Sequence, residues 1–130
     1  MHIYILALDC FPVTIRRRIL PENSNVCVTI ESNKHYPEIM KNSPRPEYRY
    51  AQSLLIRHPF YLTIEPVLDF DIKLFLTMIK ELSPLQVNIG ADSGNNNLPE
   101  PPKEKILELI AELEKFTIVK QKKNLNRLLK

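Results

Sequence analysis

The sequence predicts an α/β fold: a partial (β/α) barrel with four to five parallel strand–helix units and open sheet edges, in one domain over residues 1–130. Short β-branched segments alternate with amphipathic helical segments, and parallel strands need such crossover helices. The expected strands are polar on one face and apolar on the other, whereas a doubly wound sheet would be apolar on both. A chain of 130 residues with 44% hydrophobic residues is long enough to bury a core without disulfides.

The first half of the chain contains two expected strand–helix units. The apolar segment 3–8 is expected to be a strand and 13–19 a helix. The β-branched segment 26–31 is expected to be the second strand, and the second helix is expected at 47–58, before Pro59. Three prolines mark a loop between this strand and helix: Pro37, Pro44 and Pro46.

The clearest helix follows the next strand. Residues 60–65 form a β-branched segment, and apolar residues then recur at spacings of three and four over 72–82. Asp71 lies near the start of this segment and Pro84 lies beyond its end, as expected for the two ends of a helix.

The last third of the chain repeats the pattern. Residues 86–91 are expected to form a strand, and a proline pair at 101–102 is expected to open the next helix. The buried stripe of that helix is expected at Ile106, Leu109, Ile110 and Leu113. A strand over 116–120 and a short helical end over 124–130 complete the series.

Acidic side chains stand at the carboxyl ends of three expected strands. Glu31 ends a Val-Thr-Ile-Glu segment, Glu65 ends a nearly identical Leu-Thr-Ile-Glu segment, and Asp92 follows the third strand. Carboxyl ends of parallel strands meet at one edge, where grouped carboxylates serve acid–base catalysis or bind a cation or a ribose hydroxyl. The alternative is that these acids are solvated or cap helices.

Composition excludes several kinds of site. The two glycines, Gly90 and Gly94, are too few for a phosphate-binding loop. The two cysteines, Cys10 and Cys27, lack metal-site spacing, and Cys27 is expected to be a buried small hydrophobe. The histidines have no metal-ligand spacing either and are expected on the surface or in loops: His2, His35 and His58. No metal site and no specific catalytic residue is therefore predicted, and enzymatic activity stays open.

The carboxyl-terminal segment is basic. Only basic charged residues follow Glu114, so Lys120, Lys122 and Lys123 are candidate nucleic-acid contacts, with a solvated face as the alternative. No apolar run approaches the roughly 20 residues of a membrane span, and the amino terminus lacks a basic leader. We therefore expect no membrane association and a cytoplasmic location.

Several short motifs occur in the order found in a known family. They are TIESN at 29–33, TIEPVLDFD at 63–71, VNIGADS at 87–93, NLPEPP at 97–102 and KKNL at 122–125, with Pro44, Arg45, Arg49 and Tyr50 in the preceding segment. Together they resemble the carboxyl-terminal half of an uncharacterised, often phage-associated branch of the radical SAM superfamily. The resemblance covers about residues 20–130.

The resemblance implies a partial (β/α) barrel that uses S-adenosylmethionine and a [4Fe–4S] cluster. Glu31 would meet the ribose or amino-acid part of S-adenosylmethionine, and the remaining cavity would be lined by Glu65, Asn88, Asp92 and Ser93. Family members hold the cluster with a C-x-x-x-C-x-x-C loop in their amino-terminal half, and this sequence lacks that loop. A cluster is therefore expected only if a partner chain supplies it.

Three interpretations stay open. In the first, the chain is the carboxyl-terminal portion of a radical SAM-like protein, catalytically incompetent alone, that associates through its open sheet edges with a cysteine-bearing half or a second copy. In the second, it is a stand-alone protein that binds a nucleotide or nucleic acid through its strand-end carboxylates and basic tail. The third is an α/β sandwich without a ligand.

Overall fold

The computed structural model describes residues 2–5, by their backbone, and residues 24–130. The predicted strand at 3–8 overlaps β1 (His2–Ile5) in its first residues. The rest of that segment, the predicted helix at 13–19 and Cys10 lie outside the described residues.

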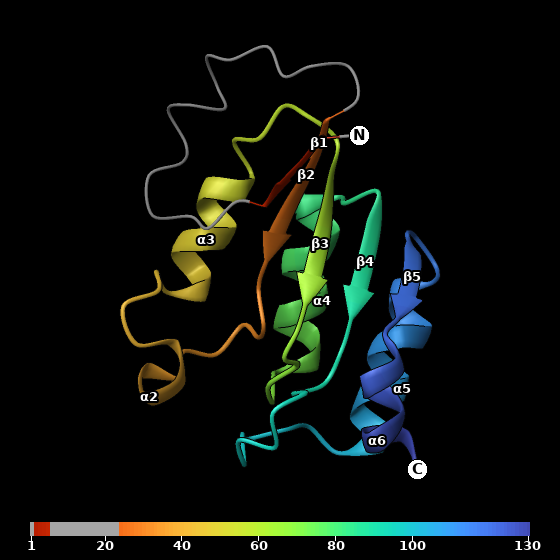
Figure 1. The fold of residues 1–130 in the computed structure, drawn as a ribbon. Helices are drawn as coiled ribbons and strands as arrows, with labels where there is room; N and C mark the ends of the chain where they lie inside the picture. Colours follow the sequence, from red (N-terminus) through yellow and green to blue (C-terminus); the bar gives the residue numbers. More distant parts are fainter. Residues whose placement is uncertain (1, 6–23) are drawn as a thin grey trace.

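The sheet has five parallel strands in the order β1-β2-β3-β4-β5 (Figure 1). The bounds of the other four strands are β2 (Ser24–Thr29), β3 (Phe60–Ile64), β4 (Gln86–Ile89) and β5 (Ile118–Gln121). Each strand pairs with its neighbour in the sequence, so β1 and β5 are the two edges of an open sheet in the described part of the chain. The predicted parallel sheet with alternating strands and helices is confirmed.

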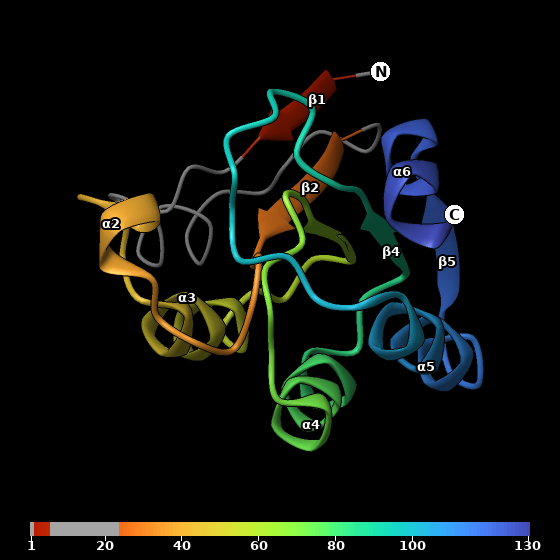
Figure 2. The ribbon, with the colours of Figure 1, turned by 90° about the horizontal axis from the view of Figure 1, so that it is seen from below.

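Three helices connect consecutive strands and lie on the same side of the sheet (Figure 2). They are α3 (Pro46–Ser53), α4 (Ile72–Leu82) and α5 (Lys103–Leu113). The short α2 (Pro37–Met40) lies in the connection between β2 and α3. After β5, the 3-10 helix η1 (Lys123–Leu125) leads into α6 (Asn126–Leu129), which packs against α5.

The core lies between the sheet and these three helices. Alternate residues of the central strands are fully buried on this side: Val26, Val28, Leu62, Ile64, Val87 and Ile89. The helices contribute Phe75, Ile79, Ile106, Leu109 and Leu113. On the opposite face, Thr29, Thr63 and Asn88 are only half-buried and lie opposite one another across the strands. The predicted division into an apolar and a polar face is therefore confirmed in β2, β3 and β4.

The clearest predicted helix has the predicted bounds and cap. Asp71 Oδ1 accepts a hydrogen bond from the Leu74 amide at 2.9 Å, which satisfies one of the free donors of the first turn of α4. Ser83 follows the last turn at φ 50°, in the left-handed region, and its amide closes the helix on Ile79 O.

Other predicted bounds differ from the structure. β2 begins before the predicted strand because Ser24 and Asn25 pair with β1. The predicted helix 47–58 ends at Ser53, and β5 begins at Ile118 rather than at 116. The predicted loop after β2 contains α2, where Pro37 at the first helical position has a backbone angle suited to a helix.

Among the described residues, no helix combines the length and apolar character needed to cross a bilayer.

Candidate functional site

The predicted site residues lie at the carboxyl ends of the strands, the lower end in Figure 1. Glu31 and Glu65 follow β2 and β3, Asn88 lies within β4, and Asp92 and Ser93 follow β4. Because the strands are parallel, their connections to the following helices meet at this edge. The segment between β4 and α5 runs across this end of the sheet (Figure 2).

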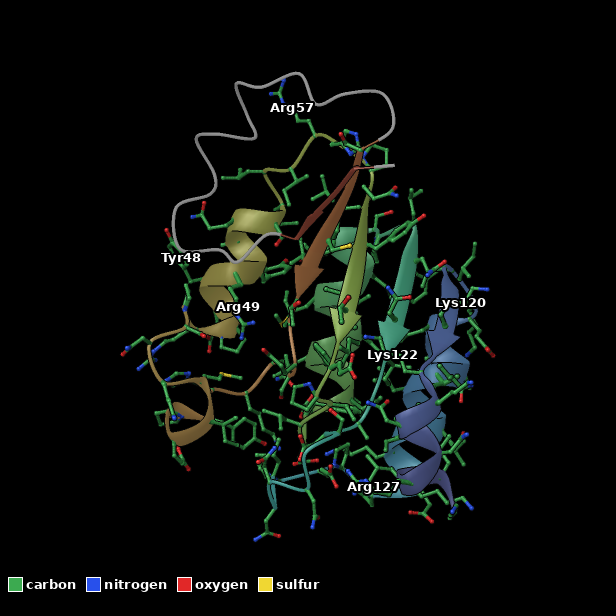
Figure 3. The ribbon with its side chains drawn as sticks, in the orientation of Figure 1. Tyr48, Arg49, Arg57, Lys120, Lys122 and Arg127 are labelled. Carbon is green, nitrogen blue, oxygen red and sulfur yellow. The ribbon has the colours of Figure 1, made fainter. Side chains whose placement is uncertain are left out.

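Glu31 is paired with a buried arginine from α3. Arg49 Nη2 lies 2.6 Å from Glu31 Oε2, and Arg49 Nη1 donates a hydrogen bond to Thr29 O at 2.7 Å. Figure 3 shows the Arg49 side chain on α3. This side chain is 6% exposed. Glu31 Oε2 is buried and is held in this ion pair with the Arg49 guanidinium.

Glu65 lies in a network with Lys122 and Asn124. Lys122 Nζ forms an ion pair with Glu65 Oε2, and Asn124 Nδ2 donates to Glu65 Oε1 at 2.7 Å. The same amide group of Asn124 donates to Ala91 O at 2.8 Å, and its Oδ1 accepts from the Ala91 amide at 3.3 Å. Asn124 thus joins the ends of β3 and β4 to the chain after β5.

Gly90 makes room for this network. A Cβ atom on Gly90 would lie 2.9 Å from Glu65 Cδ and 2.9 Å from Asn124 Oδ1. Such distances are too short for a side chain at this position, so the Glu65 carboxylate can cross the end of β4 only because residue 90 is glycine.

Asp92 organises its own loop. Its carboxylate accepts hydrogen bonds from the amides of Asn96 at 2.6 Å and Gly94 at 3.2 Å, and from Asn96 Nδ2 at 3.0 Å. The backbone hydrogen bonds from Asn96 and Gly94 lower the pKa of Asp92 below its usual value. The neighbouring Ser93 is exposed.

Asp69, in the connection after β3, also contacts the connections after β2 and β4. Its carboxylate is held by Lys34 at 2.7 Å and Lys105 at 2.6 Å. Its backbone oxygen accepts from the Tyr36 hydroxyl at 2.7 Å, and its amide donates to Pro99 O at 2.7 Å. Burial acts to raise the pKa of Asp69, but the hydrogen bonds from Lys105 and Lys34 lower it below its usual value.

A groove of about 750 Å³ opens beside these residues. Its walls come from the connection after β2, which contributes Tyr36, Glu38, Ile39 and Lys41, and from the connection after β4. The latter contributes Asp92, Asn96, Asn97, Leu98 and Pro99, and Pro66 from the connection after β3 completes the lining. Clefts of this size hold small molecules or short chain segments.

The cysteine and the histidines form no metal-binding group in the described part of the chain. Cys27 is a free thiol, half-buried on the polar face of β2 rather than in the core, and burial raises its pKa. Its placement corrects the expectation of a buried hydrophobe, since odd-numbered positions of β2 face away from the helices. His35 is half-buried, and His58 Nδ1 lies 2.7 Å from Pro59 O.

The three lysines proposed for nucleic acid have different surroundings. All three are exposed, but Lys122 also forms an ion pair with Glu65. Figure 3 labels Lys120 and Lys122 on the carboxyl-terminal segment. Arg127, farther along the same segment, is paired with Glu100. The positive charge of the carboxyl-terminal segment is thus partly neutralised by the acids of the strand ends and the β4–α5 connection.

Sequence reasoning located the strand-end acids but assigned no role to Arg49 or Asn124. Both lie within segments that carry the family resemblance, which was the only signal available for them. Comparison of the chain with protein-family models, curated proteins and solved structures finds no match.

Proposed function

We propose that this chain is the carboxyl-terminal portion of a radical SAM-like protein, and that its polar sheet face and carboxyl edge bind S-adenosylmethionine. The observation that supports this most is a sequentially ordered parallel sheet with α3, α4 and α5 on one face and a polar opposite face. An arc of a (β/α) barrel would have this arrangement, and in such barrels the strands' carboxyl ends carry the ligand site.

The chemistry of the strand ends fits S-adenosylmethionine. Its ribose hydroxyls and ammonium group are donors, and the carboxylates of Glu31 and Glu65 at the strand ends are acceptors. Its sulfonium is cationic, so carboxylates nearby stabilise it. Arg49 and Lys122 fix Glu31 and Glu65 in position, while the amide of Asn88 adds donors within the sheet. Asp92 and Ser93 border the site at the β4–α5 connection.

The residues of this chain do not fit a [4Fe–4S] cluster. Such a cluster requires several thiolates, and the sequence holds only Cys10 and Cys27. In our proposal the cluster belongs to a cysteine-bearing partner, and the chain alone is catalytically incompetent. Among the described residues, β1 and β5 form the edges of the sheet, and in our proposal backbone pairing with that partner, or with a second copy, takes place there.

An NMR titration with S-adenosylmethionine tests the binding proposal. Amide signals of Glu65, Gly90 and Asp92 should shift, and those of the outer face of α5 should not. The Glu65→Gln variant should weaken binding about tenfold, because a charge-assisted contact contributes on the order of 1.5 kcal/mol. Glu108→Gln on the exposed side of α5 is the matched control and should bind normally.

Two results would overturn the proposal. One is the absence of any shift at millimolar S-adenosylmethionine. The other is an equal affinity for adenosine, which would show that the methionine part is not recognised and would favour the nucleotide-binding interpretation instead.

A further inference from the structure

We propose that Lys122 regulates the strand-end site: its ammonium group occupies the Glu65 carboxylate, and a ligand cation must displace it to bind there. This inference rests on the proposed function, because it concerns the same S-adenosylmethionine site. It adds an internal competitor to that site, which lowers the affinity for a cationic ligand and leaves the affinity for an uncharged one unchanged.

The sheet brings Lys122 to Glu65 across the end of β4. The amide of Gly90 donates to Ile64 O at 3.0 Å, and the amide of Lys122 donates to Ile89 O at 2.8 Å, so the parallel ladders continue past the strands. Glu65, Gly90 and Lys122 therefore follow one another across this edge. Lys122 Nζ forms an ion pair with Glu65 Oε2, and the glycine between them has no side chain that could separate the two charges.

The two oxygens of the Glu65 carboxylate have different partners. Oε1 accepts a hydrogen bond at 2.7 Å from the side-chain amide of Asn124, which is itself bonded to the carbonyl and the amide of Ala91. Asn124 is uncharged, so it orients the Glu65 carboxylate and leaves its negative charge in place. Oε2 is paired with the ammonium of Lys122 instead, and this contact neutralises the charge that a cationic ligand would use.

The side chain of Lys122 can leave Glu65 while its main chain stays in place. The main chain is held by the hydrogen bond to Ile89 O and by the fully buried Leu125 three residues farther on. The Lys122 side chain is 46% exposed and has a flexible four-carbon stem, so its ammonium can turn into solvent. An ion pair this exposed changes an equilibrium by about fivefold at most, which a ligand cation can overcome.

Removing the internal cation provides the test. NMR titrations with S-adenosylmethionine and with uncharged adenosine compare the unmodified chain with Lys122→Met, which should bind S-adenosylmethionine about three to five times more tightly and adenosine equally well. Lys122→Arg keeps the charge and should bind both ligands like the unmodified chain. Lys123→Met is the matched control, because Lys123 is exposed and belongs to no ion pair among the described residues. It removes the same charge one residue away and should leave both affinities within about twofold.

A direct readout follows the ammonium itself. On addition of S-adenosylmethionine, the side-chain ammonium signal of Lys122 should move to the position of the unpaired Lys123 signal. The amide of Ala91 should stay protected from hydrogen exchange in Lys122→Met, because Asn124 and Leu125 still hold the segment.

The outcomes separate this inference from the proposed function. If S-adenosylmethionine binds the unmodified chain and Lys122→Met gains no affinity, or Lys123→Met gains as much, the competition is wrong and the binding proposal stands. A loss of affinity in Lys122→Met would likewise overturn the competition, because it would make Lys122 a ligand contact. If millimolar S-adenosylmethionine binds neither protein, the proposed function is wrong and the competition with it.

Discussion

Gly90 controls how closely the end of β4 approaches Glu65. We predict that Gly90→Ala lowers the free energy of unfolding by about 1–3 kcal/mol, the usual cost of inserting a methyl group into a filled space. The new Cβ would lie 2.9 Å from both Glu65 Cδ and Asn124 Oδ1, and both groups are held by other bonds. Urea denaturation measures the effect, with Ser93→Ala at an exposed neighbouring position as the control. If Gly90→Ala were as stable as this control, the close packing of Glu65 on Gly90 would be wrong.

Arg49 neutralises Glu31 inside the protein. We predict that Arg49→Ala lowers the free energy of unfolding by about 3–5 kcal/mol, because it leaves a mostly buried carboxylate without its cation. Arg49→Ala also removes the donor to Thr29 O.

The double variant Arg49→Met/Glu31→Leu separates the two causes of this loss. It removes both charges and should recover most of the stability, since apolar replacement of a buried ion pair is often neutral or stabilising. The exposed Arg45→Ala is the control for loss of a positive charge. A double variant no more stable than Arg49→Ala alone would mean that the unpaired Glu31 charge is not what destabilises the protein.

Asp69 holds several elements together, because it joins the connections that follow β2, β3 and β4. Its folded-state pKa is lowered by Lys105 and Lys34 against the opposing effect of burial. Its ionised form therefore stabilises the folded state above the unfolded pKa of about 3.9, and this contribution is lost as pH falls through the lower folded-state pKa.

We predict that Asp69→Asn lowers stability by about 1 kcal/mol at pH 7, a modest value because the carboxylate is 31% exposed. The difference between the two proteins should shrink below about pH 4 and vanish once Asp69 is protonated. Thermal melts from pH 7 to about pH 2 measure it, with the exposed Glu104→Gln as the control. A difference that stays constant over this range would exclude the carboxylate's charge as its cause.

The elements that the sequence predicted best are those fixed by local signals. In α4, apolar spacing, Asp71 and Pro84 all indicate the same helix, and the structure has it at Ile72–Leu82. The end of α3 and the first residues of β2 depend on neighbours instead. β2 begins at Ser24 because β1 pairs there, and no feature of residues 24 and 25 alone indicates a strand.

At the scale of the whole molecule, the site was predictable only in part. The rule that parallel strands end at one edge located Glu31, Glu65 and Asp92 correctly with respect to the sheet. Their partners were not predictable, because Lys122 and Asn124 lie 57 and 59 residues from Glu65 along the chain. Basic residues near the carboxyl terminus gave the same sequence signal whether they pair with a carboxylate, as Lys122 does, or are exposed with no ion pair among the described residues, as Lys120 is.

The last prediction concerns the proposed division of a cofactor site between this chain and a cysteine-bearing partner. Anaerobic reconstitution of this chain with iron and sulfide should give no stoichiometric absorbance near about 400 nm, because several clustered thiolates are needed to hold a cluster. Cys27 belongs to no group of three or more metal-binding side chains among the described residues. The Cys10→Ser/Cys27→Ser variant is the control, and it should give the same background absorbance as the unmodified chain.

A stoichiometric cluster that this variant loses would mean that the chain holds iron itself, and the need for a cysteine-bearing partner would disappear. If no cluster forms while S-adenosylmethionine still shifts the signals of Glu65 and Gly90, the result would support the proposed division of the site. The sheet edges that β1 and β5 form among the described residues would then be the places to look for the partner.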